Sequence, residues 1–269
     1  MTNSNATLQT FRVEDYRALL RNLFYSFVIG LAWECLPASS QSTSLATASE
    51  NTFGISAAKY KYDEPGYMTL KATKIGFDFS STYAPRSKWP NAADSWFYKA
   101  QISYLAGSAD YTSTISGDLR KTPHSFYEAR LLSGKDIDMG TYVLSPYIGV
   151  GYRHLFSDLG YERTSNYTTM PIGLTHKVKL ADNSHLHTTL EYSHLLSGVQ
   201  KVKLIQNINM DQKSGYGLRF SMLRRFDTWS LGPTLTYWNL DQSELGAPTP
   251  LYEPKNKTLE IGLKGAFHF

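Results

Sequence analysis

The feature that most constrains the fold is a period of two that runs from about residue 52 to the end of the chain. Residues 96–104 show the pattern. One face is apolar and aromatic and the other is polar: Trp96, Tyr98, Ala100, Ile102 and Tyr104 against Lys99, Gln101 and Ser103. Successive side chains of a strand point to opposite faces. The pattern therefore predicts an all-β fold built from amphipathic strands.

The aromatic residues lie at the ends of several apolar faces. The face over residues 142–152 runs from Tyr142 to Tyr152, and the face over 229–237 runs from Trp229 to Tyr237. Membrane barrels carry aromatic girdles at both interfaces, with aliphatic residues between them. A soluble sandwich has no reason to place aromatic residues at both ends of a buried face. We therefore predict an antiparallel transmembrane β-barrel. A mean hydropathy of −0.34 argues against a helical membrane protein.

About ten segments carry the alternation, and most reach the roughly 9–11 residues that a tilted transmembrane strand needs. Connections in the second half alternate between short and long, which predicts an even strand count with both termini at the periplasmic end. The first half fits this alternation less well, so eight or twelve strands also agree with the pattern. The segments lie near residues 52–62, 67–79, 94–106, 124–133, 140–155, 167–178, 185–194, 214–224, 228–239 and 257–269.

The N-terminal segment has the organisation of a secretory leader. Residues 23–33 form an apolar run too short to span a bilayer as a helix, and three arginines precede it. Small residues follow, so we expect a signal peptide over residues 1–38, a periplasmic lead-in over 39–51 and a barrel over 52–269. A buried core helix is the alternative for residues 23–33. Cys35, the one cysteine, would be removed with the leader, and Glu34 before it argues against a lipidation site.

The last eleven residues give the most specific signal in the chain. One face carries alternating hydrophobic residues up to a terminal aromatic: Leu259, Ile261, Leu263, Phe267 and Phe269. This resembles the terminal strand of bacterial outer-membrane proteins, and the resemblance implies that the barrel-assembly machinery binds it. An unpaired final strand offers a free edge to which a partner can add.

A broader resemblance covers roughly residues 52–269. Residues 147–153 (YIGVGYR) and 171–174 (PIGL) look like strands of small opacity-type or porin-like outer-membrane proteins. The resemblance implies the outer membrane of a Gram-negative bacterium. It identifies architecture and leaves activity open, because that superfamily includes adhesins, narrow pores, structural anchors and a few hydrolases.

If the aromatic faces point to lipid, the opposite faces line the lumen. They carry charges of both signs in near balance, and buried charges are tolerated when they are paired. A barrel of eight to ten strands is nearly filled by side chains, so we expect an internal ion-pair network and favour a plugged lumen over a narrow diffusion pore. The predicted charged network is Lys74, Asp78, Lys99, Glu128, Arg130, Arg153, Glu191, Arg219, Glu260 and Lys264, and Gln101 is expected on the same inward face.

The sequence offers little catalytic chemistry. Ser184 precedes His185 and Ser193 precedes His194, but neighbours on a strand point to opposite faces. Three acids near the expected outer loops, Asp158, Asp241 and Glu244, have no recognisable histidine partner. We therefore predict no catalytic residue, no metal and no cofactor, and leave a lipid- or peptide-hydrolysing barrel as the last alternative.

The expected role is therefore structural or adhesive. Binding would occur through external loops near residues 107–122, 156–166, 195–212 and 241–256. The expected partners are outer-membrane lipid, lipopolysaccharide, the assembly machinery and a host-surface ligand. A net charge of +4 spread singly along the chain argues against nucleic acid.

Overall fold

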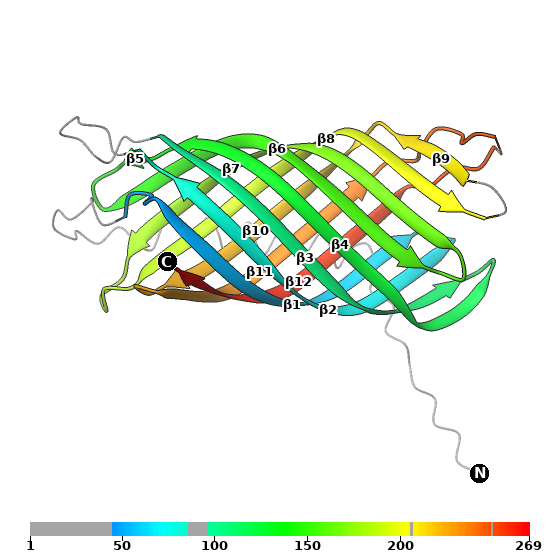
Figure 1. Cartoon of the computed structure of the whole chain (residues 1–269), viewed down its shortest axis with the longest axis horizontal. Coiled ribbons are helices and arrows are strands. Elements are labelled where there is room, and N and C mark those ends of the chain that lie inside the picture. Colours follow the sequence, from blue (N-terminus) through cyan, green and yellow to red (C-terminus); the bar gives the residue numbers. More distant parts are fainter. Residues whose placement is uncertain (1–44, 86–95, 205–206, 249) are drawn as a thin grey trace, which may run out of the picture. The chain divides into compact units, whose positions relative to one another are not determined.

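The computed structural model describes residues 45–85, 96–204, 207–248 and 250–269. The predicted signal peptide lies outside the described residues, as do residues 39–44 of the lead-in. Antiparallel strands account for most of what is described (Figure 1). Their bounds are β1 Glu50–Glu64, β2 Met68–Tyr83, β3 Trp96–Ser113, β4 Gly117–Lys135, β5 Ile137–Asp138, β6 Tyr142–Asp158, β7 Glu162–Lys179, β8 His185–Lys203, β9 Asn207–Gln212, β10 Gly215–Arg225, β11 Trp229–Leu240 and β12 Asn256–His268.

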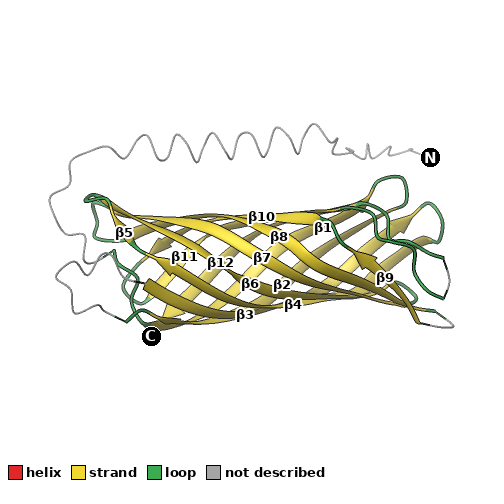
Figure 2. Cartoon of the chain, turned by 90° about the horizontal axis from the view of Figure 1, so that it is seen from above, coloured by secondary structure: helices red, strands yellow, loops and turns green. Residues whose placement is uncertain are grey.

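Ten of these strands close into a ring. The order runs β10-β11-β12-β1-β2-β3-β4-β6-β7-β8, and β8 pairs with β10 to complete the circle. β5 is a short addition to β6, and β9 pairs with the end of β8 beyond the ring. The predicted antiparallel barrel of about ten strands is confirmed. Figure 2 shows the strands crossing at a common slant, as closure of a barrel requires.

Both ends of the barrel chain meet at one rim. The backbone N–H of Asn51 donates to the carbonyl of Phe269 at 2.7 Å, and the N–H of Phe269 donates back at 2.9 Å. We call this rim the terminal end; the opposite rim, where the turn after Glu64 lies, is the far end. An even number of antiparallel strands brings both ends of the barrel chain to the same rim.

The ring strands from β1 to β8 are longer than the sequence indicated, whereas β10, β11 and β12 have the predicted lengths. They span 11 residues in β10 and 19 in β4 and β8. The expected outer loops are largely strand: only residues 114–116 separate β3 from β4, and only 159–161 separate β6 from β7. The prediction of long loops at 107–122 and 156–166 was wrong, because polar residues that follow an apolar stretch can continue a ladder above the bilayer. The longest far-end connection is residues 241–255.

The outer wall is apolar. Side chains that a soluble protein would bury are exposed around the ring, including Ile75 at 64% and Leu131 at 62%. Tyrosines contact one another on this surface, with ring centroids 6.0 Å apart for Tyr127 and Tyr152 and 6.0 Å apart for Tyr192 and Tyr216. Such a belt is stable when lipid covers it. The barrel is therefore a membrane-spanning protein of the outer-membrane type. Further members are Phe53, Ile55, Phe77, Tyr98, Ile102, Tyr104, Ile148, Val150, Ile172, Ile261, Leu263 and Phe267.

A few positions depart from the predicted faces. Leu235 and Tyr237 belong to the outward alternation of β11, yet they are only 8% and 7% exposed. Tyr237 packs against Tyr216, with ring centroids 6.4 Å apart. The ring of Tyr216 therefore helps to cover Tyr237, whereas Leu235 is among the residues that line the lumen cavity. Within the described residues, no helix is long and apolar enough to cross a membrane.

Candidate functional site

The centre of the lumen holds a compact ion-pair network. Arg219 on β10 donates to Glu128 on β4 at 2.6 Å, and its Nε lies 3.4 Å from a carboxylate oxygen of Glu191 on β8. Glu191 also pairs with Arg130 and accepts a hydrogen bond from the hydroxyl of Tyr147 at 2.7 Å. Charge-assisted hydrogen bonds of this kind offset the cost of removing both charges from water. Four strands are thereby tied together across the lumen.

Two further pairs join the predicted residues of β2 and β12. Lys74 Nζ lies 2.8 Å from Glu260 and is fully buried, over the ring of Tyr60. Lys264 pairs with Asp78 across the intervening strand β1. Gly54 stands between them, and a Cβ there would come 2.5 Å from a carboxylate oxygen of Asp78. The missing side chain thus makes room for this pair.

Two basic residues of the predicted set have no carboxylate partner within the described part of the chain. No carboxylate oxygen of that part lies within 4 Å of Lys99 Nζ. The guanidinium of Arg153 stacks on aromatic rings, 4.4 Å from the centroid of Phe126 and 5.4 Å from that of Trp238. Arg153 is 3% exposed. The other charged residues of the predicted network are therefore ion-paired, around Glu128 and Glu191, around Asp78 and around Glu260. Lys99 and Arg153 are not part of these pairs.

The charged residues line a cavity of about 520 Å³. It extends from the turn residues Asn183 and Asp227 at the terminal end to Arg153 and Phe126. Thirteen serine and threonine residues contribute to its wall. The predicted charges thus surround a polar space and do not fill the lumen by themselves.

The terminal mouth of the cavity is held by residues that the sequence analysis did not select. Thr47 donates to Asp136 from its hydroxyl at 2.9 Å, and Lys177 Nζ lies 2.9 Å from the same carboxylate. Arg225 donates to Glu50 at 2.8 Å. The segment before β1 is therefore attached to the barrel wall. Position in the alternation could have identified Lys177, but Asp136 lies between strands and gives no periodic signal.

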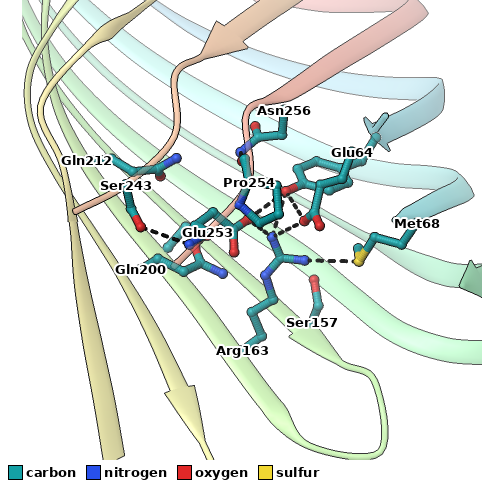
Figure 3. A network of polar contacts seen from close by, with 12 residues as sticks. Glu64, Met68, Ser157, Arg163, Gln200, Gln212, Ser243, Glu253, Pro254 and Asn256 are labelled. Atoms are coloured by element: carbon teal, nitrogen blue, oxygen red, sulfur yellow. Dashed lines mark hydrogen bonds and ion pairs between the residues drawn. The ribbon is translucent and has the colours of Figure 1, made fainter. Parts of the chain in front are cut away.

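The far half of the lumen is closed by a buried network around Arg163 on β7 (Figure 3). Arg163 Nη2 donates to Glu64 at 2.8 Å and to the hydroxyl oxygen of Tyr62 at 2.6 Å, and it also pairs with Glu253. Tyr62 in turn donates to Glu253 at 2.7 Å. Arg163 is 7% exposed, and both glutamates are 5% exposed. We call Arg163, Glu64, Glu253 and Tyr62 the plug.

Glu253 enters the plug from the connection between β11 and β12. Its backbone N–H donates to Ser243 Oγ at 2.8 Å, and Gln212 Nε2 donates to the carbonyl of Asp241 at 3.2 Å. Lys255 and Ser214 donate to the Asp241 carboxylate, which lowers the pKa of Asp241. The connection is therefore bound at both ends and carries Glu253 into the barrel.

Apolar side chains complete the closure. The cluster next to the plug consists of Tyr60, Met68, Leu70, Ala72, Ala109, Tyr111 and Leu159. The void left beside Arg163 measures about 30 Å³, which is space for about one water molecule. Alternation places Arg163 and Glu64 on the inward faces of their strands, whereas Glu253 lies in a connection. None of the three was predicted as part of a site, because no local pattern shows that residues so far apart in sequence meet.

The structure does not assemble the serine–histidine groups noted in the sequence. Ser184 bonds to Asp182 at 2.6 Å, and Ser193 bonds to Glu191 at 3.1 Å. A different pair meets near the terminal mouth, where His268 Nε2 lies 3.0 Å from Ser230 Oγ. Its Nδ1 contacts the Thr52 hydroxyl at 3.2 Å. A triad needs a carboxylate hydrogen-bonded to that nitrogen, and the nearest one described, on Glu50, is 3.8 Å away.

The three acids expected near the outer loops also lie apart from any histidine contact. Asp158 accepts from the backbone of Gly160 at 3.2 Å, and Glu244 pairs with Lys213 at 2.7 Å. Asp241 is held by Lys255. Among the residues described, no group of three or more histidine, cysteine or acidic side chains is placed to hold a metal ion.

Comparison with known proteins gives matches of structure alone. No protein-family model matches the chain, and no curated protein matches it. Among solved structures, the outer membrane protease OmpT of Escherichia coli is 11% identical with a TM-score of 0.43, over 82% of this chain and 96% of that one. The β domain of the Bordetella autotransporter BrkA is 8% identical with a TM-score of 0.41, over 82% and 100%. Ail of Yersinia pestis is 12% identical with a TM-score of 0.34, over 83% and 100%.

Proposed function

We propose that this protein is a closed, non-conducting and non-enzymatic outer-membrane barrel that acts at the cell surface in a structural or adhesive role. The observation that carries the proposal is the plug. Arg163, Glu64 and Glu253 occupy the far half of the lumen, and the connection of residues 241–255 brings Glu253 there. Because that half of the lumen is filled, we expect no continuous path for ions through the barrel. We therefore place the function at the far rim.

The far rim presents apolar side chains beyond the lipid-facing belt. The Tyr67 and Tyr252 hydroxyls lie 3.3 Å apart, and Thr114, next to Ile115, donates its backbone N–H to the carbonyl of Tyr67. Ile115 is 77% exposed and Leu245 is 66% exposed. We call Tyr67, Ile115, Leu245, Leu251 and Tyr252 the rim patch. Water-exposed apolar groups of this kind suit contact with another surface, which supports an adhesive role.

Lysines on the outer wall suit the phosphates of lipopolysaccharide. Lys61 and Lys71 are opposite each other in the β1–β2 ladder, and Lys59 lies one outward position further along β1. On the other side of β1, Lys257 of β12 is the register partner of Asp63. Anionic head groups at this level of the outer wall would be attracted to these lysines. Lipopolysaccharide is therefore the lipid partner that we propose.

A narrow diffusion pore is the second candidate, and the cavity of about 520 Å³ is the observation that favours it. Conduction would require the connection carrying Glu253 to leave the lumen. Planar-bilayer recording of refolded protein separates the two. We expect no current steps from the wild type and steps from the double variant R163Q/E253Q. Steps from the wild type comparable to those of the variant would overturn the closed barrel.

The surface role needs its own test. Cells that display the protein are compared with cells that display I115S/L245S, both at matched surface levels. We expect the substitutions to lower adherence to host-cell monolayers several-fold, because the rim patch loses its most exposed apolar groups. The control is L131S, which removes a similar group from the lipid-facing belt. Equal adherence of all three strains would contradict an adhesive rim.

A further inference from the structure

The cavity at the terminal end has more positive charge on its wall than its own ion pairs neutralise. Seven basic residues line it, and five of them have a carboxylate within 4 Å. The remaining two are Lys99 and Arg153. The one lining acid without an ion pair in the described chain is Asp227, which is exposed in the turn between β10 and β11. Neither Lys99 nor Arg153 therefore has a counterion among the residues that the structure describes.

An uncompensated cation in a low-dielectric space is costly, and proteins normally pair it. Arg153 gains part of its stabilisation from the faces of Phe126 and Trp238, because an aromatic face attracts a cation. Among the described residues, Lys99 has no such contact. Its ammonium group is on the lumen side of β3, where two basic groups, Lys264 and Arg130, and two acidic groups, Glu50 and Asp78, act on it. Each of these four is already ion-paired with another residue. The wall at Lys99 is thus suited to an anion.

The rest of the wall indicates the kind of anion. Thirteen serine and threonine residues line the cavity, Ser80, Ser103 and Thr236 among them, and a similar number of lining residues are apolar. Phe97, two residues before Lys99 on the same face of β3, is one of the aromatic residues that line the cavity. Hydroxyls and one aromatic face are the groups that bind a polyhydroxylated ring, and a volume of about 520 Å³ lies in the range of small-molecule sites. A bare inorganic ion would leave most of this space unused.

We propose that the cavity at the terminal end is a binding site for a small polyhydroxylated anion, such as a sugar phosphate, whose charge is neutralised by Lys99. The ligand enters at the terminal mouth, beside the segment that Thr47 fastens to Asp136. Arg153 marks the deep end of the site. The site is separate from the plug and from the rim patch, so it goes beyond the proposed surface role and does not depend on it.

Titration calorimetry of the full chain, refolded in detergent, tests this site with glucose 6-phosphate as the probe. We expect saturable one-to-one binding that Lys99→Gln weakens at least tenfold. The control Lys213→Gln removes an equal charge from the far end, where Lys213 pairs with Glu244, and it should bind like the wild type. Absence of saturable binding, or equal affinity of the Lys99 variant and the wild type, overturns the proposal.

Two further arms define the ligand class. Glucose should bind at least tenfold more weakly than glucose 6-phosphate, because it lacks the charge. If inorganic phosphate binds as tightly as the sugar phosphate, the site holds a simple counterion and the proposal fails. Should Lys99→Gln not fold, Lys99→Met replaces it. Wild-type binding that is unchanged between about 0.05 M and about 0.5 M salt would also overturn the role of charge.

Discussion

Glu64 on β1 and Arg163 on β7 lie 99 residues apart in sequence, yet their carboxylate oxygen and guanidinium nitrogen are 2.8 Å apart in the closed half of the lumen. Glu253 approaches the same nitrogen from the connection between β11 and β12. The two carboxylates share one guanidinium, so three distant segments depend on a single side chain for their charge balance.

Loss of the Glu253 charge should therefore weaken the barrel. Glu253→Gln keeps the shape and removes a buried, charge-assisted contact, which contributes about 1.5–3 kcal/mol. We expect a matching fall in the free energy of unfolding, measured by urea titration in lipid vesicles. The control is Glu244→Gln, whose partner Lys213 is 69% exposed, and it should change little. Equal effects of the two substitutions would contradict a special role for Glu253.

The outward belt can be tested with two isoleucines of similar exposure. Ile75 is 64% exposed on β2 and Ile115 is 77% exposed in the turn after β3. Arginine on the lipid face of a barrel costs about 2–4 kcal/mol at the bilayer midplane and far less near the interfaces. We expect Ile75→Arg to lower folding stability in vesicles by roughly that amount and Ile115→Arg to leave it nearly unchanged. A larger loss of stability from Ile115→Arg than from Ile75→Arg would show that Ile75 does not face the core of the bilayer.

Gly173 supports the central ion-pair network indirectly. A Cβ at this position would come 2.2 Å from the ring of Tyr147, whose hydroxyl bonds to Glu191. Gly173→Ala should displace the ring and cost about 1–3 kcal/mol, the usual range for overpacking. Gly265→Ala is the matched control, because its nearest neighbour would be at an ordinary 3.6 Å. Equal stability of both variants in urea titration would show that the ring moves freely.

The terminal strand should govern assembly in cells. Deletion of Phe269 removes the aromatic end of the predicted signal and two backbone hydrogen bonds with Asn51. We expect several-fold less folded protein in the outer membrane, detected as the band that shifts on boiling. Purified protein should still refold in detergent, since most of the β12 ladder remains. Normal cellular levels of the shortened chain would argue against Phe269 as an assembly signal.

Acid should loosen the far connection through Asp241. Hydrogen bonds from Lys255 and Ser214 lower the pKa of Asp241. A carboxyl with a lowered folded-state pKa contributes stability above its ordinary pKa, and that contribution is lost as the pH falls through the lowered value. Pepsin cleavage within residues 241–255, normalised at each pH to cleavage of an unfolded substrate, should therefore rise as the pH falls through this window. Asp241→Asn should remove the pH dependence, and an unchanged profile would count against this anchor.

The barrel could be predicted from local features of the sequence. Alternation such as that of residues 96–104 is a local property, because each side chain on a strand points opposite to its neighbour whatever lies across the sheet. The outward faces, the approximate strand positions and the inward charges on β2, β3, β4 and β8 all follow from it. The C-terminal pattern ending at Phe269 has the same local origin, and its role in assembly stays a prediction.

The tertiary structure decided what occupies the lumen. Inward-facing residues are known from alternation, but which of them meet depends on strand count, register and the path of connections. Arg163 meets Glu64 and Glu253 only because the barrel closes and residues 241–255 fold inward. Lys99 has no ion-pair partner in the described chain for the same reason: the acids near it, Glu50 and Asp78, pair with Arg225 and Lys264. Ion pairing acts through space over a few ångströms, so a linear pattern can supply the charges and leave their pairing open.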